Sequence, residues 1–169
     1  KANDSSGEPL WIMDVSGMGG TSNIARLSAD SYHRAMDDFQ TALVKLSEAN
    51  IPESERFKKV QDGRKESSDI FHKLGKEIKL IIPPRGDYER FSLSESLVRY
   101  LVLALIEPAH KVTLDTFLNR LYDNFRIVIG PEQYRKAIVE NKTLEIRDMG
   151  DYFQTNVQEF QSFLKSCGF

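Results

Sequence analysis

Apolar side chains recur at alternating spacings of four and three along the first half of the chain. This spacing is typical of one face of an amphipathic helix. Ser28 has a hydroxyl that suits a helix N-cap, and Pro52 disfavours helical geometry at the residue before it. We therefore predict a helix that begins at Ser28 and ends near Asn50. Its apolar positions are Tyr32, Met36, Phe39, Leu43 and Leu46.

The same register continues after Pro52, which is well placed to open a second helix. Two positions in this register are polar, Arg64 and Ser67, and they lie beside Gly63. We predict an antiparallel helical hairpin over residues 28–82 whose second arm is weakened at this point. The gap indicates either a break in the second helix, which is our preferred interpretation, or a place where something else packs. The apolar positions of the second arm are Phe57, Val60, Phe71, Leu74, Ile78 and Ile81.

The C-terminal half begins after a stretch that cannot be helical. Residues 83–93 start with two prolines and contain Gly86, so we predict that they link two subdomains. Ser92 or Ser94 is expected to cap the next helix, whose apolar face is wide enough to predict burial almost all round. The later predicted elements are a helix capped by Thr113, an extended segment at 127–129, a short helix opened by Pro131, a strand at 144–146, and a helix from Asp151 closed by Gly168.

The predicted fold class is therefore mostly α, with an N-terminal antiparallel helical hairpin followed by an α(+β) body. Leu10 to Val15 is a short apolar run, which indicates either one edge strand or an arm packed on the body. The predicted divisions are an arm and loop at 1–27, the hairpin at 28–82, the linker at 83–93 and the body at 94–169.

Composition narrows the class of protein. The 169 residues are 40% hydrophobic and 28% charged, which suits a folded core and excludes a disordered tail or a collagen-like repeat. The net charge is −2, but residues 1–55 carry 4 basic and 9 acidic groups and residues 56–85 carry 9 and 4. We expect these opposite segments to neutralise each other along the hairpin, in preference to a free basic patch. The single Cys167 fits a reducing compartment, so we expect a cytoplasmic protein, and both chain ends look cut from a longer one.

Candidate catalytic and metal-binding groups are sparse. The segment from Asp14 to Met18 resembles the start of the metal-dependent adhesion motif of von Willebrand factor A domains, but Met18 stands at the second serine position. We predict a plain loop through Gly20, because a phosphate-binding loop would need a lysine before Thr21. The three histidines have no metal-ligand spacing and no neighbouring nucleophile. The sequence thus predicts no enzyme, no metal and no cofactor.

The order of elements from Ser94 to Ile146 resembles that of winged-helix domains, a helix-turn-helix variant. The resemblance implies that the helix from Pro131 to Asn141 presents its outer side to the DNA major groove. It also implies protein docking, since many winged-helix domains serve only that purpose. We favour docking over duplex contact, because the net charge is −2 and the sequence has no dense basic face. The implied contact residues are Gln133, Arg135, Lys136 and, just beyond the helix, Lys142.

The stretch from Pro83 to Gly130 also resembles the C-terminal regions of large bacterial nucleic-acid-handling or phage-defence proteins, which implies a role in antiviral defence. The resulting hypothesis is a non-catalytic binding and assembly module of a larger protein, with double-stranded DNA or a protein as partner and no membrane contact. A second DNA-contacting group would be the hairpin cluster Lys58, Lys59, Arg64 and Lys65.

Two alternatives remain open. One is a purely helical protein-interaction adaptor, whose hairpin receives a partner helix at the seam near Arg64 and Ser67. The other is the regulatory part of an enzyme whose catalytic part lies elsewhere in the chain.

Overall fold

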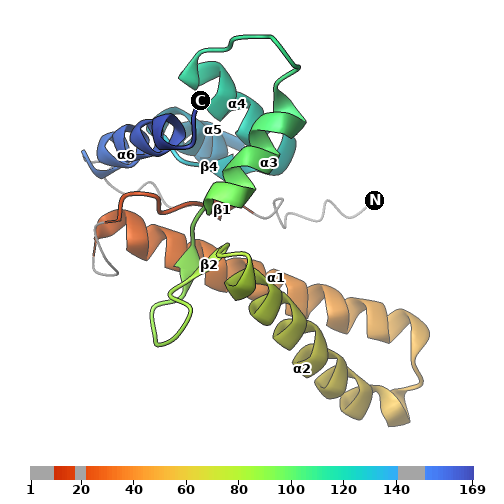
Figure 1. Ribbon diagram of the computed structural model, residues 1–169. Coiled ribbons are helices and arrows are strands. Elements are labelled where there is room, and N and C mark those ends of the chain that lie inside the picture. The colour runs from red at the N-terminus through yellow and green to blue at the C-terminus, as the bar shows by residue number, and fades with distance from the viewer. Residues whose placement is uncertain (1–9, 18–21, 141–150) are drawn as a thin grey trace.

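The computed structural model describes residues 10–17, 22–140 and 151–169. Within these residues the fold is mostly α with a small β part, as the sequence predicts (Figure 1). In chain order the elements are β1 (Trp11–Ile12), α1 (Asn23–Asn50), α2 (Glu53–Glu77), β2 (Ile81–Ile82), β3 (Arg90–Phe91), α3 (Glu95–Leu105), α4 (Leu114–Phe125), β4 (Ile127–Val128), α5 (Pro131–Glu140) and α6 (Tyr152–Ser166).

Helices α1 and α2 form a long hairpin that projects from the rest of the molecule (Figure 1). Helix α1 begins earlier than expected, because Ser22 is the N-cap and its Oγ accepts a hydrogen bond from the amide of Ala25 at 3.2 Å. The prediction that Ser28 caps this helix is wrong. Ser28 lies inside α1, is fully buried, and donates its hydroxyl to the carbonyl of Phe91 at 2.8 Å.

Helix α2 is continuous from Glu53 to Glu77, so the predicted break near Gly63 is also wrong. A single glycine costs a helix only about 1 kcal/mol relative to alanine. The surrounding residues are mostly good helix formers, and the (i, i+4) pair Lys59–Glu55, 2.8 Å apart, lies on the same helix. Local helix propensity therefore keeps α2 continuous, although the apolar register is interrupted by the polar residues Arg64 and Ser67.

The base of the hairpin is tied into the core by a small antiparallel sheet. Strand β2 pairs with β3, with Ile81 opposite Phe91, and both side chains are fully buried. The segment 83–93, expected to be a linker, thus ends in core residues, because Phe91 packs edge-on against Tyr32 of α1 with ring centroids 5.5 Å apart. Only its first part is a loop, and one hydrophobic cluster joins the hairpin base to the body.

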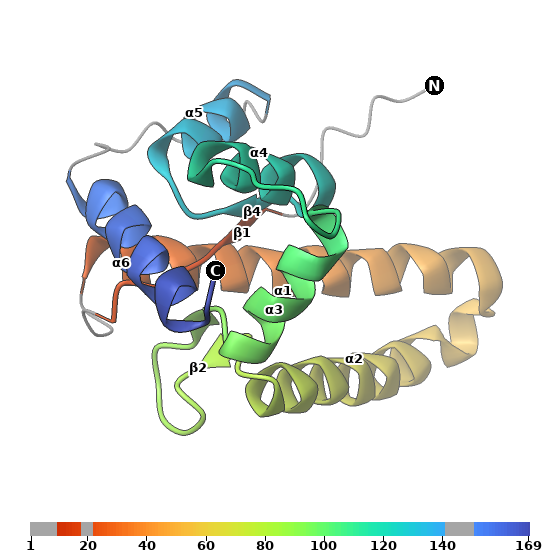
Figure 2. The same ribbon diagram turned by 45° about the horizontal axis from the view of Figure 1, so that its top comes forward.

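The N-terminal segment lies in the middle of the molecule. Strand β1 runs parallel to β4, with Trp11 opposite Ile127 and Ile12 opposite Val128. The chain then turns to the other sheet, where the amide of Asp14 donates to the carbonyl of Phe91 at 2.9 Å. Figure 2 shows this segment between the hairpin and the C-terminal helices.

Helix α3 departs from the prediction of burial almost all round. It lies at the edge of the body (Figure 2), so one face contacts the core through Val98 and Leu101 while the other faces solvent. Tyr100 and Leu103 on that outer face are 66% and 78% exposed.

The two N-caps predicted in this half are confirmed. Ser94 accepts from the amide of Leu97 at 3.3 Å, and Thr113 accepts from the amide of Thr116 at 3.2 Å. Pro131 is the first residue of α5, as predicted. The strand expected at 144–146 lies outside the described residues.

No helix among the described residues is both long enough and apolar enough to span a bilayer.

Candidate functional site

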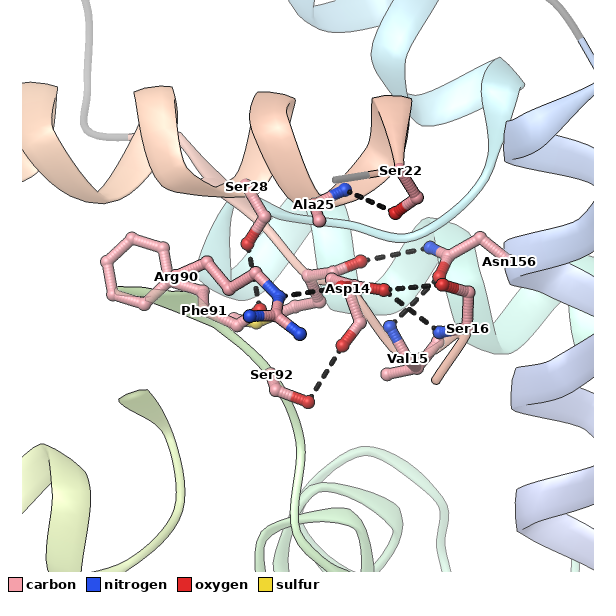
Figure 3. A network of polar contacts seen from close by, with 11 residues as sticks. Asp14, Val15, Ser16, Ser22, Ala25, Ser28, Arg90, Phe91, Ser92 and Asn156 are labelled. Atoms are coloured by element: carbon pink, nitrogen blue, oxygen red, sulfur yellow. Dashed lines mark hydrogen bonds and ion pairs between the residues drawn. The ribbon is translucent and has the colours of Figure 1, made fainter. Parts of the chain in front are cut away.

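The most deeply buried polar groups meet where the N-terminal segment crosses β3 (Figure 3). Asp14 is 2% exposed, and its Oδ2 lies 2.8 Å from Nε of Arg90. Its Oδ1 accepts from the amide of Ser16 at 3.1 Å and from the Ser16 hydroxyl at 2.7 Å. The carboxylate is thus both charge-paired and hydrogen-bonded, which is what a buried charge requires.

Asn156 of α6 completes this junction from the other side. Its side chain is fully buried, and Nδ2 donates to the carbonyls of Met13 and Ile129, each at 2.9 Å. Its Oδ1 accepts from the amide of Val15 at 2.9 Å (Figure 3). One side chain therefore satisfies three backbone groups on two segments of the chain.

We call the group Asp14, Ser16, Ser28, Arg90, Ser92 and Asn156 the polar junction. Ser92 adds a bond from its hydroxyl to the carbonyl of Asp14 at 2.8 Å. The described partners of these side chains are protein groups, and they join segments far apart in sequence. These contacts hold backbone segments in place, and the hydrogen bonds described leave no side chain of the polar junction as a free base or nucleophile for catalysis.

A second polar cluster lies at the base of the hairpin. Oε1 of Glu89 is 2.5 Å from Nε2 of His72 and 2.6 Å from Nζ of Lys76. Burial opposes ionisation of Glu89, but the hydrogen bonds from Lys76, His72 and Tyr32 outweigh it and lower its pKa below the usual value. Burial, with the Glu89 charge beside it, raises the pKa of Tyr32, which stays a hydrogen-bond donor. These groups bind one another and clamp α1, α2 and the loop before β3.

Helix α5, the predicted DNA-reading helix, presents fewer contact groups than expected. Gln133 is only 3% exposed, and its Nε2 donates to Oδ1 of Asn119 on α4 at 2.7 Å. The prediction that Gln133 lies on the outer side is therefore wrong. It lies on the buried side of α5 together with Tyr134 and Ala137.

The two exposed basic residues of α5 are each next to a carboxylate. Arg135 forms an ion pair with Glu132, and Nζ of Lys136 lies 2.5 Å from Oδ1 of Asp123. Nζ of Lys136 also lies 5.0 Å from the ring centroid of Tyr122. These partners weaken the positive field that a phosphate would meet. Lys142 lies outside the described residues.

Tyr122 is buried directly beneath this surface. Its hydroxyl donates to Oε2 of Glu140 at 2.6 Å, and burial followed by the Glu140 contact raises its pKa. A shallow groove of about 450 Å³ runs along this face with both signs of charge. Its lining residues are Asn119, Glu132, Arg135, Lys136, Val139 and Glu140.

The predicted basic cluster of the hairpin lies on α2, away from α5 (Figure 2). The structure therefore does not bring the two predicted DNA-contacting groups together. Lys58, Lys59 and Lys65 are exposed, and Lys59 pairs with Glu55 of its own helix. Arg64 is half-buried in the seam, and its Nε is buried with no hydrogen-bond partner.

Sequence reasoning missed the largest exposed apolar groups of the hairpin. Leu46 is 65% exposed and Phe57 is 79% exposed, although the periodicity placed both in the seam. A helix that packs against a single neighbour buries only part of its apolar face. The predicted two-helix hairpin already implied that some apolar residues would stay exposed. Other large apolar side chains exposed on these helices are Phe39, Ile70 and Leu74.

Among the described residues, no group of three or more His, Cys, Asp or Glu side chains could hold a metal ion. Comparisons with protein families, with curated proteins and with solved structures found no match.

Proposed function

We propose that this chain is a non-catalytic protein-binding module and that its binding element is the distal hairpin, residues 35–73. The observation that carries the proposal is the exposure of large apolar side chains on both helices of this hairpin. Exposed apolar surface on a folded protein is typical of interaction sites. Helical faces with apolar side chains at spacings of three and four accept other helices.

The body supports this role as an anchor. Its interior polar side chains, such as Asp14 and Asn156, hold backbone segments together. The first half of α1 is part of that body, since Ile24 and Tyr32 are buried there. The hairpin therefore leaves the body with a fixed direction and presents its far end to a partner.

Contact with duplex DNA is the second candidate. Exposed Arg135 and Lys136 on α5 favour it, and the groove beside them could admit a phosphate. Glu132 and Asp123 oppose it, because a phosphate would compete with carboxylates already at hydrogen-bond distance. We rank protein binding first for this reason.

The proposed setting follows the sequence analysis: a larger cytoplasmic protein, with a role in antiviral defence. The support for a reducing compartment is the lone Cys167, which is free and buried.

The test compares the two candidates with matched variants. Tagged wild-type chain, a Leu46→Glu variant and a Lys136→Glu variant are expressed in the cells that make the protein, and co-purifying proteins are quantified. We expect a partner that is lost with Leu46→Glu and retained with Lys136→Glu, because only the first change alters the distal hairpin.

The same three proteins are titrated against a labelled duplex by fluorescence anisotropy, starting at low salt. We expect no saturable binding. Binding that falls with salt and is lost in Lys136→Glu would instead support the DNA candidate.

A further inference from the structure

A cavity of about 750 Å³ lies where helix α3 ends and the chain turns toward α4. Its volume is within the range of small-molecule sites and exceeds that of the groove on α5. Its walls come from the last turn of α3, from the connection at residues 106–112, which is at the top of Figure 1, and from Arg120 of α4. This part of the body is separate from the distal hairpin, so a ligand of the cavity goes beyond the proposed function.

The connection between α3 and α4 contains a tight turn from Glu107 to His110. The amide of His110 donates to the carbonyl of Glu107 at 3.1 Å. Pro108 suits the second position of such a turn. Ala109 follows it with a φ of 67°, a left-handed conformation that a residue with a side chain adopts only where its surroundings hold it. One wall of the cavity is therefore a defined turn.

Arg120 brings a positive charge to this cavity from α4. Its Nη1 donates to the carbonyl of Leu105 at 2.7 Å, which fixes the guanidinium against the end of α3. Among the described residues, this carbonyl is the one hydrogen-bond partner of the guanidinium. Solvent reaches its other nitrogens, because the one buried and unpartnered side-chain nitrogen of the described residues is Nε of Arg64. The remaining N–H groups of Arg120 are thus available to an acceptor in the cavity.

Lys111 adds a second positive charge to the cavity lining. It is exposed and forms no ion pair with a described residue. The acidic residue of the lining is Glu107, whose side chain is 82% exposed and whose Oε2 lies 3.4 Å from Nδ1 of His110. Two basic residues and one acidic residue give the lining a net charge of +1 with His110 neutral.

The groove on α5 differs from this cavity in the partners of its basic residues. There, Arg135 forms an ion pair with Glu132. Nζ of Lys136 likewise lies 2.5 Å from a carboxylate oxygen of Asp123. An anion that enters the groove must compete with both carboxylates, whereas the two bases of the cavity meet no carboxylate of a described residue. The cavity is therefore the better anion site of the two.

The rest of the lining includes the apolar side chains Leu103, Ile106 and Val112. Apolar walls with a few charged groups are typical of small-molecule sites, and a guanidinium matches the geometry of a carboxylate or a phosphate. We propose that this cavity binds a small organic anion, a phosphate or carboxylate joined to an apolar group. Arg120 is the main contact of the anion, Lys111 adds the second charge, and the apolar walls cover the attached group.

Nuclear magnetic resonance of the isotope-labelled full chain tests the site, with phenyl phosphate and phenylacetate as probes. We expect saturable shifts of the amide signals of residues 107–112 and of Nε of Arg120. Binding of either anion supports the proposal, and the tighter of the two identifies the preferred anionic group. Inorganic phosphate is expected to bind roughly tenfold more weakly than phenyl phosphate, because it has no apolar group to bury. Phenol, which has no anionic group, is expected not to saturate the site.

Three variants assign the site to its residues. Arg120→Met is expected to weaken binding roughly tenfold or more, because a charged hydrogen-bond donor is lost. Lys111→Met is expected to weaken it roughly threefold, since an exposed charge contributes less. Lys136→Met in the groove on α5 is the matched control and leaves affinity unchanged. Circular dichroism checks the fold of each variant. Because Arg120 also holds the carbonyl of Leu105, Lys111→Met carries the test if Arg120→Met loses helix content.

The proposal is overturned if neither anion gives saturable shifts by about 10 mM. Equal affinity of the wild-type chain and of folded Arg120→Met would overturn it too, as would a control variant that weakens binding as much as Arg120→Met does. Inorganic phosphate that binds as tightly as phenyl phosphate would overturn the role of the apolar walls. None of these results bears on the co-purification test with Leu46→Glu, so the two proposals fail separately.

Discussion

The body and the distal hairpin are both built from amphipathic segments, yet they differ sharply in what those segments contact. Phe91, Phe153 and Phe160 in the body are fully buried, whereas Leu46 and Phe57 in the hairpin are mostly exposed. The body also buries polar groups and satisfies them, as at Asn156. Periodicity therefore predicts which face of a helix is apolar, and the number of neighbouring elements decides whether that face is covered.

The largest effect is expected at the polar junction. Replacing Asn156 by Leu leaves the amide of Val15 and the carbonyls of Met13 and Ile129 without their partner. Each unsatisfied buried group costs about 1–3 kcal/mol, so with three such groups we expect the free energy of unfolding to fall by at least about 3 kcal/mol. Urea denaturation monitored by circular dichroism measures it. Gln154→Leu on the exposed side of α6 is the control, with an expected change within about 0.5 kcal/mol.

Breaking the Asp14–Arg90 ion pair is expected to lower the free energy of unfolding by a slightly smaller amount. Arg90→Met leaves a buried carboxylate without its cation, which costs about 3–5 kcal/mol. Replacing both residues, as Asp14→Leu with Arg90→Met, removes the unpaired charge and should recover part of that loss. A double variant no more stable than Arg90→Met alone would show that the hydrogen bonds of Ser16 to the Asp14 carboxylate matter more than the charge pair.

The clamp between hairpin and body should make stability depend on pH. The pKa of Glu89 is lowered in the folded chain, so its contribution is present above the unfolded pKa of about 4.3 and is lost as pH falls through the folded value. We expect Glu89→Gln to be less stable than wild type near pH 7, with the gap closing as pH drops below about 4. Urea midpoints across this range measure it. Exposed Glu95→Gln is the control, and an equal gap at every pH would exclude the linkage.

The smallest effect is expected in the hairpin, and it has the opposite sign. A Cβ added at Gly63 meets no atom within 4 Å, so Gly63→Ala should stabilise α2 by about 0.5–1 kcal/mol. The matched change at the base of the hairpin, Gly75→Ala, places its Cβ 2.5 Å from Cδ1 of Ile81 and should destabilise the protein by about 1–3 kcal/mol. Thermal denaturation measures both variants. A change in stability of the same sign for both would contradict the contrast between the loosely packed distal hairpin and its tightly packed base.

Local signals in the sequence account for the elements that were predicted well. Ser94, Thr113 and Pro131 mark helix starts through bonds or geometry within a few residues, and each does so in the structure. Ser22 and Ser28 are equally suitable caps by type. The choice between them depends on the carbonyl of Phe91, 63 residues beyond Ser28, which no local pattern reveals.

The candidate site was less predictable for the same reason. Asp14 and Arg90 are 76 residues apart, and Val15 and Asn156 are 141 residues apart, so only the tertiary fold brings each pair together. The sequence predicts that Gln133 faces outward, because its hydrogen-bond partner Asn119 is identified only by the tertiary fold. The exposed hairpin residues were identified as apolar, but they stay exposed because no third layer covers them among the described residues.

The position of β1 also has a consequence for the order in which the chain folds. Its partner strand β4 lies more than 100 residues later, and Asn156 follows later still. Contacts of such long sequence separation form late, because the intervening chain must first be made and closed into a loop. During synthesis on the ribosome, the hairpin has all of its residues long before the core can close. The first surface that this chain completes is therefore the one we assign to binding.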